Sequence, residues 1–188
     1  LDANQTIEHI QSSTNRLMIL LDGLKSLATV GRDQQQMSRV DMNDIVNDVT
    51  SLLDTEIKDS NAKLNVEESL PTVLGYPSDI TALMLNLIQN AIRHHPGPTP
   101  QIWVRKLHDE KNTMLPFGRP SDMIAVEDDG VGIPEGQKRS IFHPFAKGRL
   151  HEKQGQGIGL SVAQRVMDHI EGRIWVEDRA PQGARFYI

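Results

Sequence analysis

The chain has 188 residues, of which 20 are basic and 25 acidic, so its formal net charge is −5 and a general nucleic-acid-binding surface is not expected. It has no cysteine, which excludes disulfides, thiolate nucleophiles and cysteine-bound zinc and fits a cytoplasmic location. It also has no run of about 20 apolar residues, so we expect no membrane contact by this chain, although a longer parent protein could be membrane-anchored.

The first predicted element is a long amphipathic helix over residues 1–31. Apolar residues recur there at spacings of three and four, among them Ile10, Leu17, Leu21 and Leu24. A single helix of this kind leaves its apolar face unburied, so we expect a homodimer through the same helix of a second chain. Residues 32–39 show no apolar period and are predicted to form a linker.

The main domain is predicted over residues 40–188, where helical and strand-like patterns alternate. A helix is expected to open it, with Asp41 as the N-cap. This alternation predicts an α+β fold, a two-layer α/β sandwich in which helices cover one face of a mixed sheet. Further helices are expected over 78–95 and 160–170, strands over 62–69, 101–107, 122–128, 173–178 and 184–188, and a loop over 106–122.

Two asparagines lie one turn apart in the helix predicted over 78–95. Asn86 and Asn90 stack on a face away from its apolar side, and each costs very roughly 0.5 kcal/mol relative to alanine there. An amide oxygen is a neutral ligand for Mg²⁺, and Arg93 and His94 follow where phosphate charge needs a cation. This helix alone leaves open whether the asparagines bind a ligand or cap backbone groups and face water.

A second candidate site lies where the strand over 122–128 runs into "DDGVG". Asp128 stands at the tip of the strand, and an ionised aspartate only accepts hydrogen bonds, so it suits an exocyclic amine such as that of adenine. Gly130 and Gly132 allow a flat ligand to approach the backbone. A plain acidic turn is the alternative, because Asp-Gly steps are common in turns.

Three glycines precede the helix predicted over 160–170. Gly155, Gly157 and Gly159 leave free amide donors beside the positive end of the helix dipole, which suits a phosphate. The stretch is neither a P-loop nor a dinucleotide fingerprint, because the required residues and spacings are missing. A flexible hinge or a helix cap is the alternative interpretation.

In this order and spacing, the motifs resemble the catalytic ATP-binding core of sensor histidine kinases, within the superfamily of gyrase, the Hsp90 chaperones and MutL. "LNLIQNA" is similar to the family's N box, "DDGVG" to its G1 box, "IFHPF" to its F box and "GQGIGL" to its G2 box. The resemblance covers roughly Val40 to Ile188. The segment 1–31 resembles the second helix of the dimerisation and phosphotransfer hairpin.

The resemblance implies a site for Mg²⁺ and ATP. It makes Asn90 the metal ligand and places Asn86 at the phosphate end of the site. Asp128 would accept the adenine amine. The other implied residues are phosphate contacts, pocket glycines, basic lid residues and the loop that closes over the phosphates: Arg93, His94, Gly130, Gly132, Lys147, Arg149, Gly155, Gly157, Gly159 and Leu160. The implied lid begins at the anchors Phe142 and Phe145 and runs to about Gln154.

The implied activity is that of an ATP-dependent protein histidine kinase, which passes phosphate on to the receiver domain of a response regulator. None of the seven histidines has the family's acceptor context, an acidic residue followed by Leu-Arg-Thr-Pro. We therefore expect the acceptor to be absent from this chain, either truncated away or lost, and truncation is favoured.

Two other functions remain open on the sequence. The first is an ATPase switch, as in the chaperone and mismatch-repair relatives, which carry an acidic general base where this chain has Asn86. The second is a nucleotide-binding regulatory scaffold that does not phosphorylate histidine.

Overall fold

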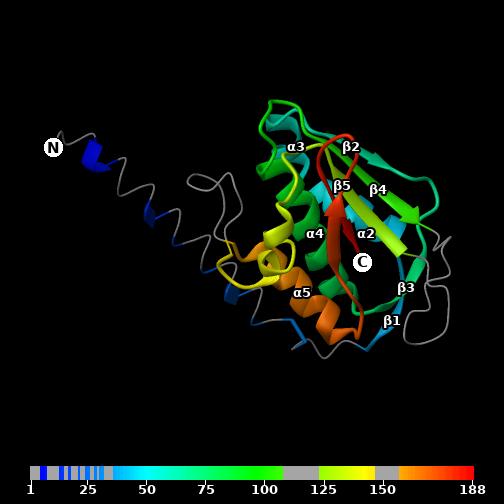
Figure 1. Cartoon of the computed structure of the whole chain (residues 1–188). Coiled ribbons are helices and arrows are strands. Elements are labelled where there is room, and N and C mark those ends of the chain that lie inside the picture. Colours follow the sequence, from blue (N-terminus) through cyan, green and yellow to red (C-terminus); the bar gives the residue numbers. More distant parts are fainter. Residues whose placement is uncertain are drawn as a thin grey trace.

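The computed structural model describes residues 5–7, 13–14, 17, 21, 24–25, 28, 30–31, 36–107, 123–146 and 157–188. Figure 1 shows the arrangement of its helices and strands. In chain order these are β1 (Ser38–Asp41), α2 (Met42–Leu52), α3 (Asp54–Asp59), β2 (Lys63–Val66), β3 (Thr72–Gly75), α4 (Pro77–Arg93), β4 (Gln101–Leu107), β5 (Met123–Asp128), the 3₁₀ turns η1 (Glu135–Gln137) and η2 (Ser140–Phe142), α5 (Gly159–His169), β6 (Trp175–Asp178) and β7 (Ala184–Tyr187).

A five-stranded mixed sheet in the order β2-β4-β5-β7-β6 forms one layer of the fold. β2 runs parallel to β4, and the other neighbours are antiparallel. Along β5, Ile124 and Val126 belong to the hydrophobic core, together with buried residues of α2, α4 and α5. The predicted α+β sandwich, with helices on one face of a mixed sheet, is therefore confirmed.

The other face of the sheet holds a buried carboxylate. Glu127 alternates with the core residues of β5 and is only 2% exposed. Its two oxygens pair with Arg179 Nε at 3.1 Å and Arg185 Nε at 2.8 Å, which satisfies a charge that would be costly to bury alone. Arg179 also stacks over Trp103, 4.0 Å from the ring centroid.

The helix predicted to open the main domain begins as expected. Asp41 is its N-cap, and its Oδ1 accepts a hydrogen bond from the Asn43 amide at 2.8 Å, which satisfies a free donor of the first turn. The helix ends at Leu52, and Leu53 separates α2 from the short α3.

A second, two-stranded sheet was not predicted from the sequence. β1 pairs antiparallel with β3, from Ser38 opposite Gly75 to Asp41 opposite Thr72. β1 thus begins two residues before the predicted start of the main domain, inside the predicted linker. A four-residue strand carries too few alternations to be distinguished from a linker by its pattern.

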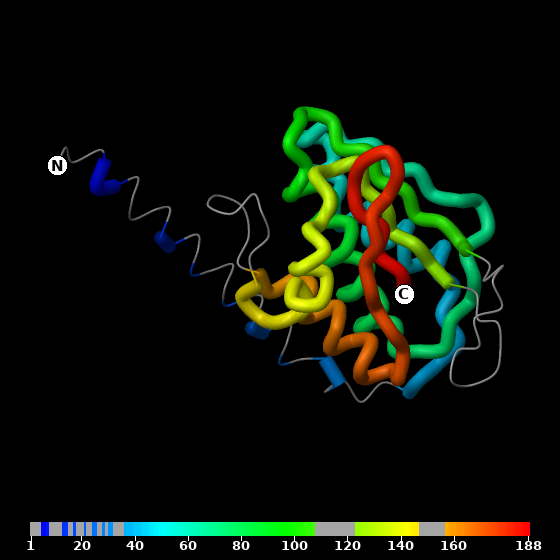
Figure 2. The backbone as a smooth tube through the Cα atoms, in the orientation of Figure 1, coloured from blue at the N-terminus to red at the C-terminus, as the bar shows by residue number. Residues whose placement is uncertain are grey.

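Helices α4 and α5 lie side by side, as the green and orange coils of the tube in Figure 2 show. Near the start of α4 and the end of α5, the two helices are joined by Asp79 and His169, whose Oδ2 and Nδ1 are 2.8 Å apart. The His169 ring also stacks on Tyr76, with centroids 4.6 Å apart. These contacts fix the start of α4 against the end of α5, at the opposite end of α5 from Gly159.

The buried side of α4 supports a stability prediction. Leu87 is 0% exposed, so Leu87→Ala would leave a cavity and should lower the free energy of unfolding by about 2–5 kcal/mol. Urea denaturation would measure this loss. Leu52→Ala is the matched control, because that side chain is 67% exposed. A loss for Leu87→Ala no larger than that of the control would contradict the packing of α4.

The predicted N-terminal helix falls largely outside the described residues. The described positions 5–7, 13–14, 17, 21, 24–25 and 28 are helical. Of the predicted stripe, Leu17, Leu21 and Leu24 are exposed, and Ile10 lies outside the described part. The long helix and the dimer through it stay predictions. None of the described helices has the length and apolar character that a membrane span requires.

Candidate functional site

Asp128 stands at the end of β5 and is the best-defined group of the candidate site. Its side chain is held by two backbone amides, because Oδ1 accepts from Gly130 N at 2.8 Å and from Ala184 N at 3.2 Å. Within the described part of the chain, no group hydrogen-bonds to Oδ2. The carboxylate therefore has one oxygen fixed by the fold and one available to a ligand.

The backbone around Asp128 is packed so closely that glycine is required at two positions. A Cβ at Gly130 would lie 2.8 Å from Asp128 Oδ1, and a Cβ at Gly183, whose φ is +114°, would overlap the Asp128 carbonyl oxygen. Gln182 Nε2 donates to the Gly130 carbonyl at 2.9 Å, which holds the two loops together. Gly132, with φ +69°, likewise packs against the Gly183 carbonyl.

The electrostatic environment of Asp128 matters for its role as an acceptor. Burial raises the pKa of its carboxyl group above the ordinary value, since the side chain is only 8% exposed. The hydrogen bonds from Gly130 and Ala184 act in the opposite direction and stabilise the ionised form. Nearby Asp129 raises the pKa further, whereas His95 lowers it.

Asn86 and Asn90 lie one turn apart on α4, as predicted, but their side chains differ in environment. Asn86 Nδ2 donates to the Ala82 carbonyl at 2.7 Å, and a Cβ at Gly159 would lie 2.8 Å from Asn86 Oδ1. Asn86 thus touches the first residue of α5. The half-buried Asn90 side chain makes no hydrogen bond to any described residue, so its amide is free to bind a ligand.

Arg93 and His94 end α4, and neither presents an unpaired positive charge. Arg93 Nε pairs with Glu56 Oε1 of α3 at 2.7 Å, and Gln89 donates to the other oxygen of Glu56 at 2.8 Å. Burial, followed by the charge of Arg93, lowers the pKa of His94, so its imidazole is neutral at pH 7. The predicted phosphate contacts would therefore need Arg93 to share or leave Glu56, and His94 to act as a neutral donor.

The predicted phosphate loop is described only from Gly157 onward. Gly157 has φ +69°, and a Cβ there would overlap the Ala146 carbonyl, so the position requires glycine. Gly159 opens α5 with no side-chain cap, so the first amides of α5 have no hydrogen-bond partner among the described residues, and Leu160 packs against the core. The predicted site residues Lys147, Arg149 and Gly155 lie outside the described residues, as does the lid from residue 147 onward.

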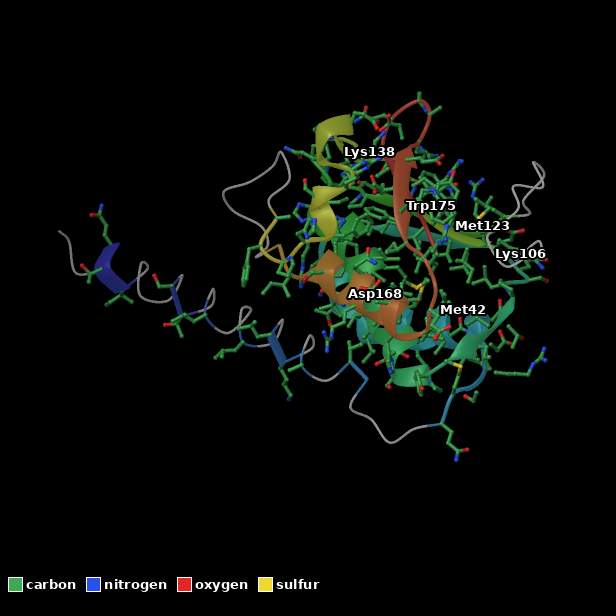
Figure 3. All side chains as sticks on the ribbon, turned by 60° about the horizontal axis from the view of Figure 1, so that its bottom comes forward. Met42, Lys106, Met123, Lys138, Asp168 and Trp175 are labelled. Atoms are coloured by element: carbon green, nitrogen blue, oxygen red, sulfur yellow. The ribbon has the colours of Figure 1, made fainter. Side chains whose placement is uncertain are left out.

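The segment after "DDGVG" is fixed to the far edge of the sheet. Lys138 Nζ lies 2.6 Å from Glu135 Oε2 and 3.0 Å from Asp178 Oδ2, and Figure 3 labels Lys138 near the end of β6. Further along, Phe142 packs edge-on against Phe186, with centroids 6.4 Å apart. These contacts anchor the start of the predicted lid.

The structure also adds residues that the sequence did not indicate. Gln182 and Gly183 from the β6–β7 connection and Ala184 at the start of β7 pack around Asp128 and Gly130. Asp129 contacts the start of β4 and the loop after α4. For residues 182–184, the glycine in "PQGAR" was the one available signal in the sequence. No pattern indicated the contacts of Asp129, since its partners are distant in sequence.

Asn90 is the one residue predicted from the sequence to bind a metal ion. In the described ranges, no three histidine or acidic side chains are grouped so as to hold a metal. An ion beside Asn90 would thus take its other ligands from water and from a bound phosphate, which is the coordination that Mg²⁺ favours.

Comparison with known proteins gives matches over most of the chain. A model of the family "Histidine kinase-, DNA gyrase B-, and HSP90-like ATPase" matches residues 75–188, which is more than half of it. The chain is 34% identical over 125 residues to the Adaptive-response sensory kinase SasA of Synechococcus elongatus, a match that covers 66% of this chain and 30% of SasA.

Solved structures share the fold. ShkA in complex with AMPPNP matches with a TM-score of 0.70 at 19% identity, over 100% of this chain and 38% of that one. Histidine kinase ThkA in complex with response regulator protein TrrA matches with a TM-score of 0.71 at 24% identity, over 100% of this chain and 52% of that one. The chain spans 22–34% of the length of eight curated relatives.

Proposed function

The chain belongs to the family of histidine kinase-, DNA gyrase B- and HSP90-like ATPases, and from this we propose that it is the ATP-binding catalytic portion of a sensor histidine kinase. The observation that carries the proposal is Asp128, with one oxygen fixed by two backbone amides and the other without a hydrogen bond from any described residue. An adenine amine is a donor that this free acceptor would bind.

The phosphate end of the site is proposed to lie between α4 and the start of α5. Asn86 touches Gly159 there, which supports placing the triphosphate between the two helices. The free amides of α5 and the positive end of its dipole favour phosphate oxygens. The lid residues Lys147 and Arg149, with Gly155, are proposed to add to this anion site.

Asn90 is the residue proposed to hold Mg²⁺, because its amide is unpartnered among the described residues. When bound, the ion would neutralise charge on the β- and γ-phosphates. The chain's own residues position the nucleotide so that an imidazole nitrogen can attack the γ-phosphorus in line as the bond to the ADP oxygen breaks. Asn86 cannot serve as the acidic base of an ATPase switch, which favours the kinase.

The partners and domain organisation are proposals of the same kind. The similarity to a histidine kinase in complex with a response regulator supports a receiver domain as the onward acceptor of phosphate. The exposed Leu17, Leu21 and Leu24 support a homodimer through residues 1–31. The linker is proposed over 32–39 and the catalytic domain over 40–188, so that β1, which begins at Ser38, spans the boundary between them.

Radiolabelling tests the proposed activity. With γ-labelled ATP and Mg²⁺, the 188-residue chain should bind nucleotide yet gain no acid-labile, base-stable label, because the acceptor histidine is proposed to lie outside it. A longer form of the protein that carries a histidine-bearing helix should become labelled.

Two outcomes would contradict the proposal. Stoichiometric acid-labile label mapped to any of the seven histidines would place the acceptor inside this chain. Absence of label on the longer form, with nucleotide binding intact, would favour a regulatory scaffold over a kinase.

A further inference from the structure

Asp129 connects three separate segments beside the proposed adenine site. Its Oδ1 accepts a hydrogen bond from the Gln101 amide at the start of β4, at 2.9 Å. The same oxygen lies 3.2 Å from Nε2 of His95, which belongs to the loop after α4. One carboxylate at the end of β5 thus holds both the end of α4 and the start of β4.

The side chain of His95 is held in this contact by burial and by Gly97. Its side chain is only 11% exposed, and its Nδ1 lies 3.0 Å from both the amide nitrogen and the carbonyl oxygen of Gly97. When Nδ1 accepts from the Gly97 amide, the neutral ring carries its proton on Nε2, and this Nε2–H faces Asp129.

The pair lies beside the loop at Gly130, whose backbone amide orients the carboxylate of Asp128. A Cβ at Gly130 would be 3.6 Å from the carbonyl oxygen of His94, so the end of α4 flanks the loop whose amide donates to Asp128. Asp129 and His95 also act on Asp128 electrostatically, in opposite directions, since Asp129 raises the pKa of Asp128 and His95 lowers it. A change in either residue of the pair would therefore affect Asp128 both through the position of this loop and through the local charge.

We propose that His95 and Asp129 form a positioning pair that holds the free oxygen of Asp128 in place for the base, and that this pair contributes to selection of adenine over other purines. The inference rests on the proposed role of Asp128 as the adenine acceptor. Neither residue touches the base itself, and both act by fixing the loop between β5 and the end of α4.

Base selectivity is the measurement that separates positioning from general stability. Inosine triphosphate carries a carbonyl oxygen where adenine has its amine, so Asp128 should reject it. Asp129→Ala should lower the ratio of ATP affinity to inosine triphosphate affinity by at least about threefold. Asp129→Asn keeps the Oδ1 acceptor for Gln101 and His95 and should restore the ratio.

His95→Ala should lower the selectivity ratio by about as much as Asp129→Ala, and the double variant should be no worse than either single one. Thermal unfolding would reveal whether Asp129→Ala folds. If it does not, His95→Ala alone provides the test. His169→Ala is the matched control, because it breaks the other histidine-aspartate contact of α4, with Asp79, far from Asp128. That variant should leave the ratio unchanged.

An unchanged selectivity ratio in folded Asp129→Ala or His95→Ala would overturn the proposal of a positioning pair. Fully additive effects of the two substitutions on this ratio in the double variant would overturn it as well. A failure of the proposed function would look different. In that case the wild-type chain itself would not distinguish ATP from inosine triphosphate, and Asp128→Asn would have no effect on binding.

Discussion

Asp128→Asn is expected to weaken ATP binding by at least about tenfold, because it turns a charge-assisted acceptor into a donor that faces the adenine amine. The asparagine can keep its Oδ1 on Gly130 N and Ala184 N, which places Nδ2 where the free carboxylate oxygen was. Isothermal titration calorimetry would measure the loss. Inosine triphosphate should bind the variant better than it binds the wild type, since its carbonyl oxygen accepts from Nδ2.

The same variant should not lose stability without ligand. Because burial raises the pKa of Asp128 in the folded state, its ionised form is less favourable there than in the unfolded chain. The contribution of this group to the free energy of unfolding therefore falls as pH rises from the ordinary pKa to the raised one. Asparagine carries no such charge, so the variant should melt at the same or a higher temperature at neutral pH.

Asp168→Asn provides a matched control for both measurements, because that carboxylate is exposed on α5 (Figure 3). It should change neither affinity nor base preference. If Asp128→Asn binds ATP as tightly as the wild type, the adenine assignment is wrong. If its affinity falls only together with a lower melting temperature, Asp128 is structural.

Asn90→Ala is expected to abolish most of the benefit of Mg²⁺ for nucleotide binding. The Asn90 amide makes no hydrogen bond to a described residue, so its removal should cost little stability, while a bound ion would lose its protein ligand. The affinity for ATP in the presence of Mg²⁺ should fall by at least about tenfold, as expected when a charge-assisted contact is lost. The affinity for adenosine should stay within about twofold.

Asn47→Ala on the exposed side of α2 is the matched asparagine control and should change neither affinity. Equal losses for ATP with Mg²⁺ and for adenosine would show that Asn90 shapes the pocket without holding a metal. An unchanged affinity for both ligands would remove Asn90 from the site.

Much of the fold could be predicted because its main elements carry strong local signals. The helix expected over 78–95 is α4 over Pro77–Arg93, since its apolar positions repeat every three to four residues and Pro96 follows its end. Asp41 could also be identified as an N-cap from a local signal, because its hydrogen-bond partner, the Asn43 amide, lies only two positions away. The order of the glycine and asparagine motifs then identified the family.

The rest depends on contacts between residues far apart in the chain. β1 becomes a strand by pairing with β3, and Arg93 meets Glu56 because α3 packs near the end of α4. The hydrogen bond from Gln101 to Asp129 follows from the register between β4 and β5, and the His95 contact depends on where α4 ends beside β5, which no single stretch of sequence displays. Local patterns thus located Asp128 and Asn90, and only the structure located the groups that hold Asp128 in place.

A crystal structure of the chain with Mg²⁺ and a non-hydrolysable ATP analogue would show directly whether Asp128 and Asn90 hold the nucleotide and its ion. We expect the adenine amine at about 3 Å from Asp128 Oδ2. We also expect the ion on the amide oxygen of Asn90 and the phosphates between α4 and the start of α5. An adenine ring bound elsewhere, with Asp128 Oδ2 facing water, would contradict the account.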